Sequence, residues 1–507
     1  MHSWRFSPMA YDAAAVSPMI VEPRVNPRVL DRTLVRGVTW TGGIKGITLL
    51  LSWASTIIVA RILSPADYGL VAMATVYIGL TTMITDFGLG SAIVALPDLS
   101  GELAAQLHAV ATLVGIVAFG LSCLVAVPLS RFFGSPNLAP VVIVLSTALV
   151  LDSLRVVPTS ILARELRFKF LSILEGLKVL IAVAFTLALA LWGAAHWALV
   201  LGNVFAALGV TLFVLTRLPQ RFARPRFRTL KSTLAFSSHF LMGQLAWYGY
   251  SNADFVVAGR VLGGTALGQY TLAWTLTSAP ADKIMAVFGR VMPTMLAAVQ
   301  RDSAALKRYF FLFTEALGIL IVPASAGLAL VAPDFVLLVF GSKWAAAVVP
   351  LQLLCFYTAI HILGTVTTPV LQVTGQASFP ARCGVVTLAI LPPAFFISGS
   401  HWGTVGIAAI WLSIYPLFLV PVYLRVFRTL EIRLRDYLEC LRPTLVSVAL
   451  MAIVVLTIRT LMSSAWPLAI RFTAQVASGA AAFVAAALFI QRRRLTALAD
   501  FLRTIRS

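Results

Sequence analysis

Charged side chains are scarce in this sequence. Asp, Glu, Lys and Arg make up 11% of the 507 residues, 60% of the residues are hydrophobic, and the mean hydropathy is +0.93. An average soluble domain carries about a quarter of its residues as charges, so this composition excludes an ordinary water-soluble fold. The sequence predicts a protein that is solvated mainly by lipid.

Cysteines and catalytic motifs are scarce too. The four cysteines (Cys123, Cys355, Cys383 and Cys440) have no CxxC spacing, and we interpret them as small apolar side chains. The sequence contains no GxxxxGK[ST] phosphate loop, no HExxH and no GxSxG, and its histidines show no metal-ligand spacing. We therefore predict that the protein is not an enzyme and that it holds neither a metal ion nor a cofactor.

Long apolar stretches follow one another along the chain. A helix of about 20 apolar residues crosses the hydrocarbon core and satisfies its own backbone hydrogen bonds. We predict an all-α polytopic membrane protein with about fourteen transmembrane helices. The expected segments are 38–61, 67–87, 107–130, 138–160, 170–192, 194–217, 233–259, 266–296, 308–332, 346–372, 381–398, 403–424, 443–461 and 468–490. Segment 266–296, which contains Pro280 and several charges, is the one that we expect to be kinked or broken.

The distribution of basic residues predicts the orientation. Most of the 39 Lys and Arg residues lie in the two tails and in alternate loops. The opposite loops hold only Arg61, Arg131, Arg260, Lys343, Arg459 and Arg471. By the positive-inside rule, both termini are cytoplasmic. The net charge of +20 then matches anionic headgroups, and no soluble basic domain is present to bind nucleic acid.

An internal repeat divides the chain. Residues 57–74 align without gaps with 256–273, so that Arg61 matches Arg260 and Gly69 matches Gly268. Six expected helices separate the copies, which predicts parallel repeats of the kind that hold a substrate between two halves of a transporter. The predicted parts are a cytoplasmic tail (1–36), an N-lobe of helices 1–6 (37–217), a basic linker (218–232), a C-lobe of helices 7–12 (233–425), a cytoplasmic loop (426–442), two further helices (443–490) and a C-terminal tail (491–507).

Four segments together carry a family resemblance. They are ARILSPADYGLVA (60–72), LARELRFKFLSILEG (162–176), GAAHWALVLGNVF (193–205) and NADFVVAGRVLGGTALGQYTLA (252–273). This ordered set resembles the polysaccharide transport (Wzx-type) flippases of the multidrug/oligosaccharidyl-lipid/polysaccharide exporter superfamily, over about residues 33–430.

The resemblance implies a function and a location. It implies a flippase in the bacterial inner membrane that moves undecaprenyl-diphosphate-linked oligosaccharide units outward for exopolysaccharide, lipopolysaccharide O-antigen or capsule synthesis. Partners would be the lipid-linked oligosaccharide itself, a polysaccharide polymerase and the chain-length machinery. Two alternatives stay open: a multidrug or other solute exporter of the same superfamily, and a non-transporting scaffold for polysaccharide enzymes.

Basic residues inside the expected spans are the candidates for binding the diphosphate. A buried charge in a membrane helix is costly, and phosphate needs fixed positive charge. Lys45, Lys283 and Arg290 have no acidic partner at i,i+3 or i,i+4 spacing and are the leading candidates. For Lys45 and Arg290 the alternative is snorkelling to the cytoplasmic interface. Arg155 and Lys178 follow, but each has a carboxylate three residues earlier, so structural ion pairs are the alternative for both.

Polar residues on the seventh helix suggest a path for sugars. Gln244, Tyr248 and Asn252 recur every four residues and share one face, with Trp247 beside it. Hydrogen bonding between helices within one lobe is the alternative interpretation. Four acidic residues are candidates for coupling to a proton or sodium gradient: Asp86, Asp254, Asp282 and Glu315.

The predicted orientation can be tested at the C-terminus. A reporter that is active only outside the cytoplasm, fused after Ser507, should stay silent, because the basic loops hold both termini inside. A strong signal would mean that one helix is miscounted. The same reporter fused in the loop that contains Arg131 should be active and serves as the control.

Overall fold

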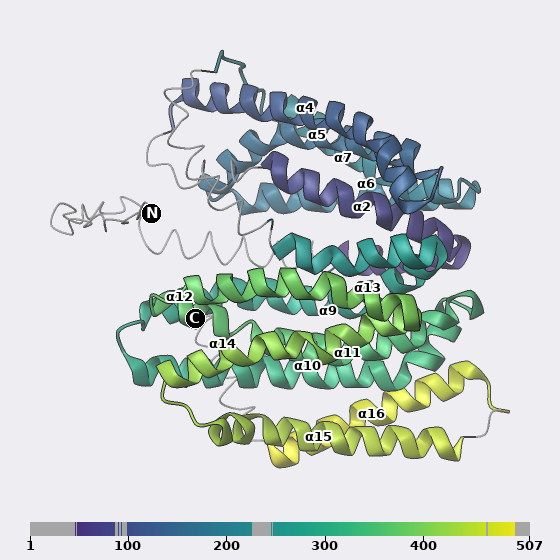
Figure 1. Cartoon of the computed structure of the whole chain (residues 1–507), viewed down its shortest axis with the longest axis vertical. Coiled ribbons are helices and arrows are strands. Elements are labelled where there is room, and N and C mark those ends of the chain that lie inside the picture. The colour runs from purple at the N-terminus through teal and green to yellow at the C-terminus, as the bar shows by residue number, and fades with distance from the viewer. Residues whose placement is uncertain are drawn as a thin grey trace, which may run out of the picture.

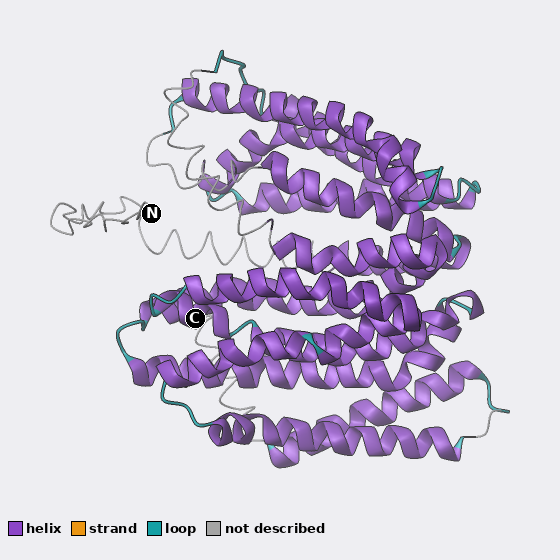
Figure 2. Ribbon diagram, in the orientation of Figure 1, coloured by secondary structure: helices purple, strands orange, loops and turns teal. Residues whose placement is uncertain are grey.

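The computed structural model describes residues 48–86, 99–225, 247–462 and 465–491, with the single positions Gly46, Gly90, Ile93 and Leu245. Within these residues the secondary structure is helical and contains no strand (Figure 2). Ten of the described helices are long and apolar enough to cross a membrane. The predicted all-α polytopic fold is confirmed, whereas the number fourteen stays a prediction.

The helices form two groups and a terminal pair (Figure 1). The first group contains helix 48–62, α2 (Pro65–Asp86), α4 (Gly101–Phe133), α5 (Leu138–Arg164), α6 (Phe168–Leu191) and α7 (His196–Arg217). The second contains helix 247–257, its π-helical end η1 (Ala258–Leu262), α9 (Gly263–Ala298), α10 (Ser303–Val339), η2 (Ser342–Ala347), α11 (Val348–Gly364), α12 (Thr367–Val373), α13 (Ser378–Ser413) and α14 (Tyr415–Thr429). The pair α15 (Leu434–Leu461) and α16 (Leu468–Ile490) packs on α10.

Several helix boundaries differ from those expected. The segment expected to be kinked or broken is the single helix α9, although it contains Pro280 and Pro293. The expected loop 426–442 is largely helical, because the chain turns only between α14 and α15. Segments 381–398 and 403–424 meet inside α13 at a kink, where Gly403 has φ 62°. Hydropathy marks only the lipid-buried part of a helix, and the 37 residues of α10 extend about 55 Å, well beyond a core of about 30 Å.

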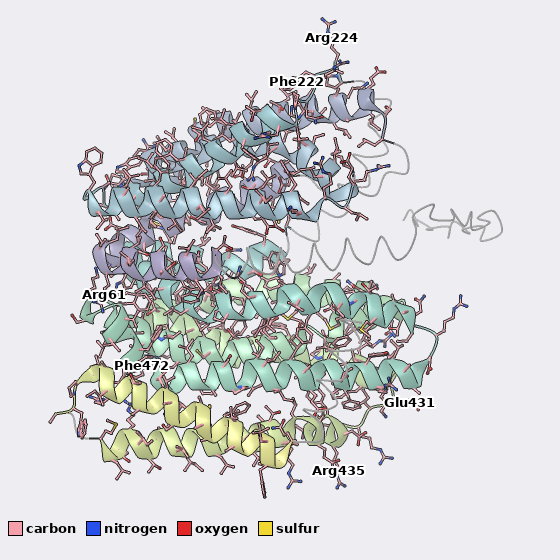
Figure 3. All side chains as sticks on the ribbon, turned by 180° about the vertical axis from the view of Figure 1, so that it is seen from behind. Arg61, Phe222, Arg224, Glu431, Arg435 and Phe472 are labelled. Carbon is pink, nitrogen blue, oxygen red and sulfur yellow. The ribbon has the colours of Figure 1, made fainter. Side chains whose placement is uncertain are left out.

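The two copies of the sequence repeat meet at one end of the bundle. Figure 3 places Arg61 at this end and Glu431 and Arg435 at the opposite one. Following the predicted orientation, we call them the outer end and the inner end. A Cβ atom added to Gly69 would overlap the backbone of Gly264, and one added to Gly268 would overlap that of Pro65. Since the alignment matches Pro65 with Gly264 and Gly69 with Gly268, α2 and α9 touch through equivalent positions of the two copies.

A buried ion pair holds the terminal helices against the second group. Asp334 of α10 accepts hydrogen bonds from Gln475 at 2.8 Å and from Arg471 at 3.2 Å, both on α16. Its side chain is 8% exposed. Removing Asp334 or Arg471 would leave the other charge unpaired next to lipid, so the ion pair fixes where α16 packs.

Candidate functional site

The surfaces of α2 and α9 change from buried to exposed between their outer and inner ends. Leu70 to Ala74 on α2 are buried, and so are Leu267, Tyr270 and Leu276 on α9. Towards the inner end, Asp86 and Lys283 are exposed, and Val287 is 62% exposed. Charged groups at this depth avoid lipid and face water or protein. The two groups of helices are therefore closed against each other at the outer end, and their inner halves present charges.

Four charged side chains gather in the first group near the inner end. Arg155 donates two hydrogen bonds to Asp152 Oδ1, at 2.9 and 2.5 Å, and the pair is partly exposed. Asp86 on α2 and Lys178 on α6 both lie within electrostatic range of this pair. The cluster joins three helices and contains two positive and two negative charges. It could receive an anion only if Arg155 or Lys178 were released from these neighbours.

Of the three leading basic candidates, the structure describes the side chain of Lys283 alone. Lys45 and the side chain of Arg290 lie outside the described residues. Lys283 is exposed on the inner half of α9, next to exposed Asp282. In the described part of the chain no hydrogen bond or ion pair holds the Lys283 ammonium, although Asp282 lies within electrostatic range of it. Lys283 is thus placed to contact an anion that enters from the inner end.

The polar face of helix 247–257 contacts the first group. The Tyr248 hydroxyl donates to the Val76 carbonyl of α2 at 2.7 Å and lies against Gly79. Asn252 donates to the Tyr248 carbonyl at 3.0 Å, and Trp247 is 48% exposed. Gln244 lies outside the described residues. The Tyr248 hydrogen bond therefore joins the two groups, whereas the expected alternative was bonding within one lobe, and the sugar path stays a prediction.

Asp254 is enclosed within the second group. Its carboxylate accepts hydrogen bonds from the Tyr270 hydroxyl at 2.6 Å, the Trp411 indole at 2.8 Å and the Phe255 backbone at 2.9 Å. The residue is completely buried, and no basic side chain of the described residues pairs with it. A carboxyl group held only by neutral donors can carry a proton or balance a small cation.

The sequence did not reveal the partners of these acids. Tyr270 and Trp411 lie in different apolar helices, and both are buried in the structure. The one feature of the sequence that could have indicated them is that each aromatic side chain carries a polar hydrogen-bond donor. Asp334 was missed because it follows the expected end of its span. Glu315, the remaining coupling candidate, is half-buried on α10. Within the described ranges no group of His, Cys, Asp or Glu is arranged to hold a metal ion.

Comparison with known proteins gives consistent matches. A family model described as "Polysaccharide biosynthesis protein" matches residues 58–349, more than half of the chain. The "Succinoglycan biosynthesis transport protein ExoT" of Rhizobium meliloti (strain 1021) is 29% identical over 401 residues, which cover 77% of this chain and 79% of that protein. The "Lipopolysaccharide biosynthesis protein WzxC" of Escherichia coli (strain K12) is 26% identical over 386 residues, 75% and 77% of the two chains.

Solved structures share the fold. The structure of "Lipid II flippase MurJ, inward closed conformation" matches with a TM-score of 0.71 at 12% identity, over 90% of this chain and 99% of that one. An inward-facing multidrug resistance MATE family transporter of the MOP superfamily matches with a TM-score of 0.60 at 15% identity, over 76% and 96%.

The role of the Asp152–Arg155 pair can be tested by neutralising one or both members. Arg155→Ala alone should lower the stability by about 1–3 kcal/mol, because it leaves the carboxylate without its donor. The double change Asp152→Asn with Arg155→Gln should recover most of this loss. Melting of the purified protein in detergent measures both.

The control for this test is Arg435→Ala. It breaks an exposed pair with Glu439 on α15 and should cost at most about 0.5 kcal/mol. If Arg155→Ala melts like the wild type, the pair does not stabilise the fold and Arg155 is free for another role.

Proposed function

This chain belongs to the family of polysaccharide biosynthesis proteins, and on that premise we propose that it is a flippase for lipid-linked oligosaccharides. The cargo would be an undecaprenyl-diphosphate-linked repeat unit, carried to the outer leaflet of the bacterial inner membrane for surface polysaccharide synthesis. The resemblance noted in the sequence is confirmed by the family match and by the superfamily fold.

One structural observation supports this proposal most directly. The two groups of helices are closed at the outer end by the contact of α2 with α9, while the inner halves of the same helices expose Asp86 and Lys283. An amphiphile with an anionic headgroup could enter between the groups from the inner end and leave after they close there and open outward. This is alternating access between parallel repeats.

The relatives' names support the choice of cargo. ExoT and WzxC are named for transport or biosynthesis of polysaccharides, and MurJ is a lipid II flippase. We propose that the present chain likewise transports and does not catalyse bond formation, with both termini cytoplasmic. A polymerase that consumes the flipped unit outside would be its functional partner. A cationic drug would instead require unpaired carboxylates. Asp152 is paired with Arg155 and Asp254 is enclosed. The exposed Asp86 and Asp282 each lie within electrostatic range of a basic side chain.

The basic residues of the inner half are the basis of the first test. Alanine at Lys283 should reduce glycan export about ten- to a hundredfold without loss of folded protein, because one charge-assisted contact with phosphate is worth about 1.5–3 kcal/mol. Alanine at Lys45 or Arg290 should act similarly. Lysine at Arg290 should retain part of the export, and glutamate should abolish it. Surface polysaccharide is measured against membrane content of the protein.

Lys307→Ala is the matched control. Lys307 also lies near the inner end of the second group, but its ammonium donates to the Glu431 carbonyl at 3.0 Å, so export should persist. Full export by the triple alanine variant of Lys45, Lys283 and Arg290 would exclude them as the diphosphate site.

Coupling to an ion gradient is the second test, and Asp254 is its first candidate. Asp254→Asn keeps the side-chain size but cannot bind a proton or compensate a cation, so transport in vesicles should lose its dependence on the gradient. Asp302→Asn is the control, because Asp302 only caps α10 and Asn caps equally well. Wild-type transport that ignores both proton and sodium gradients would instead mean that consumption of the product outside drives the flux.

A further inference from the structure

Two basic residues at the outer end form hydrogen bonds between the two groups of helices. Arg61, in the last turn of helix 48–62, donates to the Val339 carbonyl at 2.6 Å and also to the Leu338 carbonyl at the end of α10. Lys343, which follows α10 in the chain, donates to the carbonyls of Arg61 and Leu63, each at 2.7 Å. The Trp344 indole donates to the Ala60 carbonyl at 2.9 Å.

These bonds cap two helices reciprocally. The last four carbonyls of a helix lack partners within it and carry the negative end of the helix dipole. The second group supplies the donors for the end of helix 48–62, and Arg61 of the first group supplies those for the end of α10. Each group thus satisfies carbonyls of the other with a positive side chain, and neither helix end keeps these partners if the groups separate.

The second copy of the repeat makes the equivalent contact in a weaker form. Arg260, which matches Arg61, lies over the Phe132 ring at the end of α4, 5.6 Å from the ring centroid. A Cβ atom added to Gly259 would stand 2.9 Å from the Phe133 ring. The ends of α4 and α10 are themselves alike: each has the sequence Phe-Gly-Ser (133–135 and 340–342), with Gly134 at φ 63° and Gly341 at φ 94°.

We propose that the reciprocal caps at Arg61 and Lys343 form a latch that keeps the outer end closed and sets the balance between the inward-open and outward-open states. The contact of α2 with α9 at Gly69 and Gly268 brings the two groups close enough for these hydrogen bonds to form. On the opposite side, Arg260 contributes a cation–π contact with Phe132, which is weaker than the hydrogen bonds of Arg61 and Lys343. Opening outward then requires the Arg61 side to release its hydrogen bonds.

The role of the latch in transport rests on the proposed function, but the hydrogen bonds that form it do not depend on any cargo. The test of the latch therefore measures whether the outer end is open or closed, and does not measure export. Met73 is 2% exposed and lies about one turn beyond Gly69 on α2, on the side away from the outer end, so we expect it to become reachable from outside only when the outer end opens.

The experiment uses the full chain with its four cysteines replaced by alanine and Met73→Cys added. Right-side-out membrane vesicles are treated with a membrane-impermeant maleimide, and the rate of labelling is measured. Arg61→Ala and Lys343→Ala should each increase the rate about tenfold, the effect of losing one or two charge-assisted hydrogen bonds. Arg260→Ala should increase it less, since among the described residues Arg260 makes a cation–π contact and no hydrogen bond.

Arg459→Ala is the matched control, since Arg459 is also an exposed arginine in the last turn of a helix at the outer end, on α15. It should leave the rate unchanged. An equal increase in Arg459→Ala would show general loosening and overturn the latch, and so would wild-type rates in both Arg61→Ala and Lys343→Ala. If these variants fail to reach the membrane, Arg61→Lys should give an intermediate rate, and an unchanged rate would overturn the proposal.

The outcome separates the latch from the proposed function. If labelling is faster in Arg61→Ala and Lys343→Ala but the wild type exports no lipid-linked glycan, the latch is supported and the proposed flippase function is wrong. If labelling is unchanged in these variants and the wild type exports the glycan, the latch is wrong and the proposed function is supported.

Discussion

The hydrocarbon core of a bilayer contains no water, and every polar group placed there has to find its partner within the protein. Helices meet this requirement for the backbone everywhere except at their ends. Side chains meet it in pairs and small clusters, such as Asp334 with Arg471, or Asp254 with Tyr270 and Trp411. Because these partners lie on different helices, the same requirement that forces the chain into helices also decides how the helices pack.

The distribution of basic residues connects orientation with mechanism. The positive-inside rule explains why few Lys and Arg are found at the outer end. Of those few, Arg61 and Lys343 join the two groups of helices, Arg260 packs across them, and Arg471 holds α16 against α10. Most of the basic residues at the outer end therefore make a specific contact within the protein. The many basic residues at the inner end are explained by the positive-inside rule and by attraction to anionic lipid headgroups.

The two repeat copies form the contact that closes the outer end and that has to separate when this end opens. Equivalent positions of α2 and α9 touch through backbone at Gly69 and Gly268, and buried side chains such as Met73 and Tyr270 pack in the same core beside this contact. At the outer end, the hydrogen bonds between the two groups that the structure describes are those of Arg61, Lys343 and Trp344, whereas Tyr248 bonds to Val76 further along α2. Outward opening therefore has to break these hydrogen bonds and also to separate the buried side chains of α2 and α9.

The sequence by itself determined the solvent, the helical class, the repeat and the family, because hydropathy, local charge and short motifs are properties of consecutive residues. It also placed Arg61 and Arg260 at matching helix ends. Only the tertiary structure decided what each charge does. Arg155 is held by Asp152 with Lys178 and Asp86 nearby, Tyr248 bridges to Val76, Asp254 is enclosed, and Arg61 caps a helix some 280 residues away. These outcomes depend on the rotation of each helix and on which neighbour it meets, and no local pattern in the sequence contains that information.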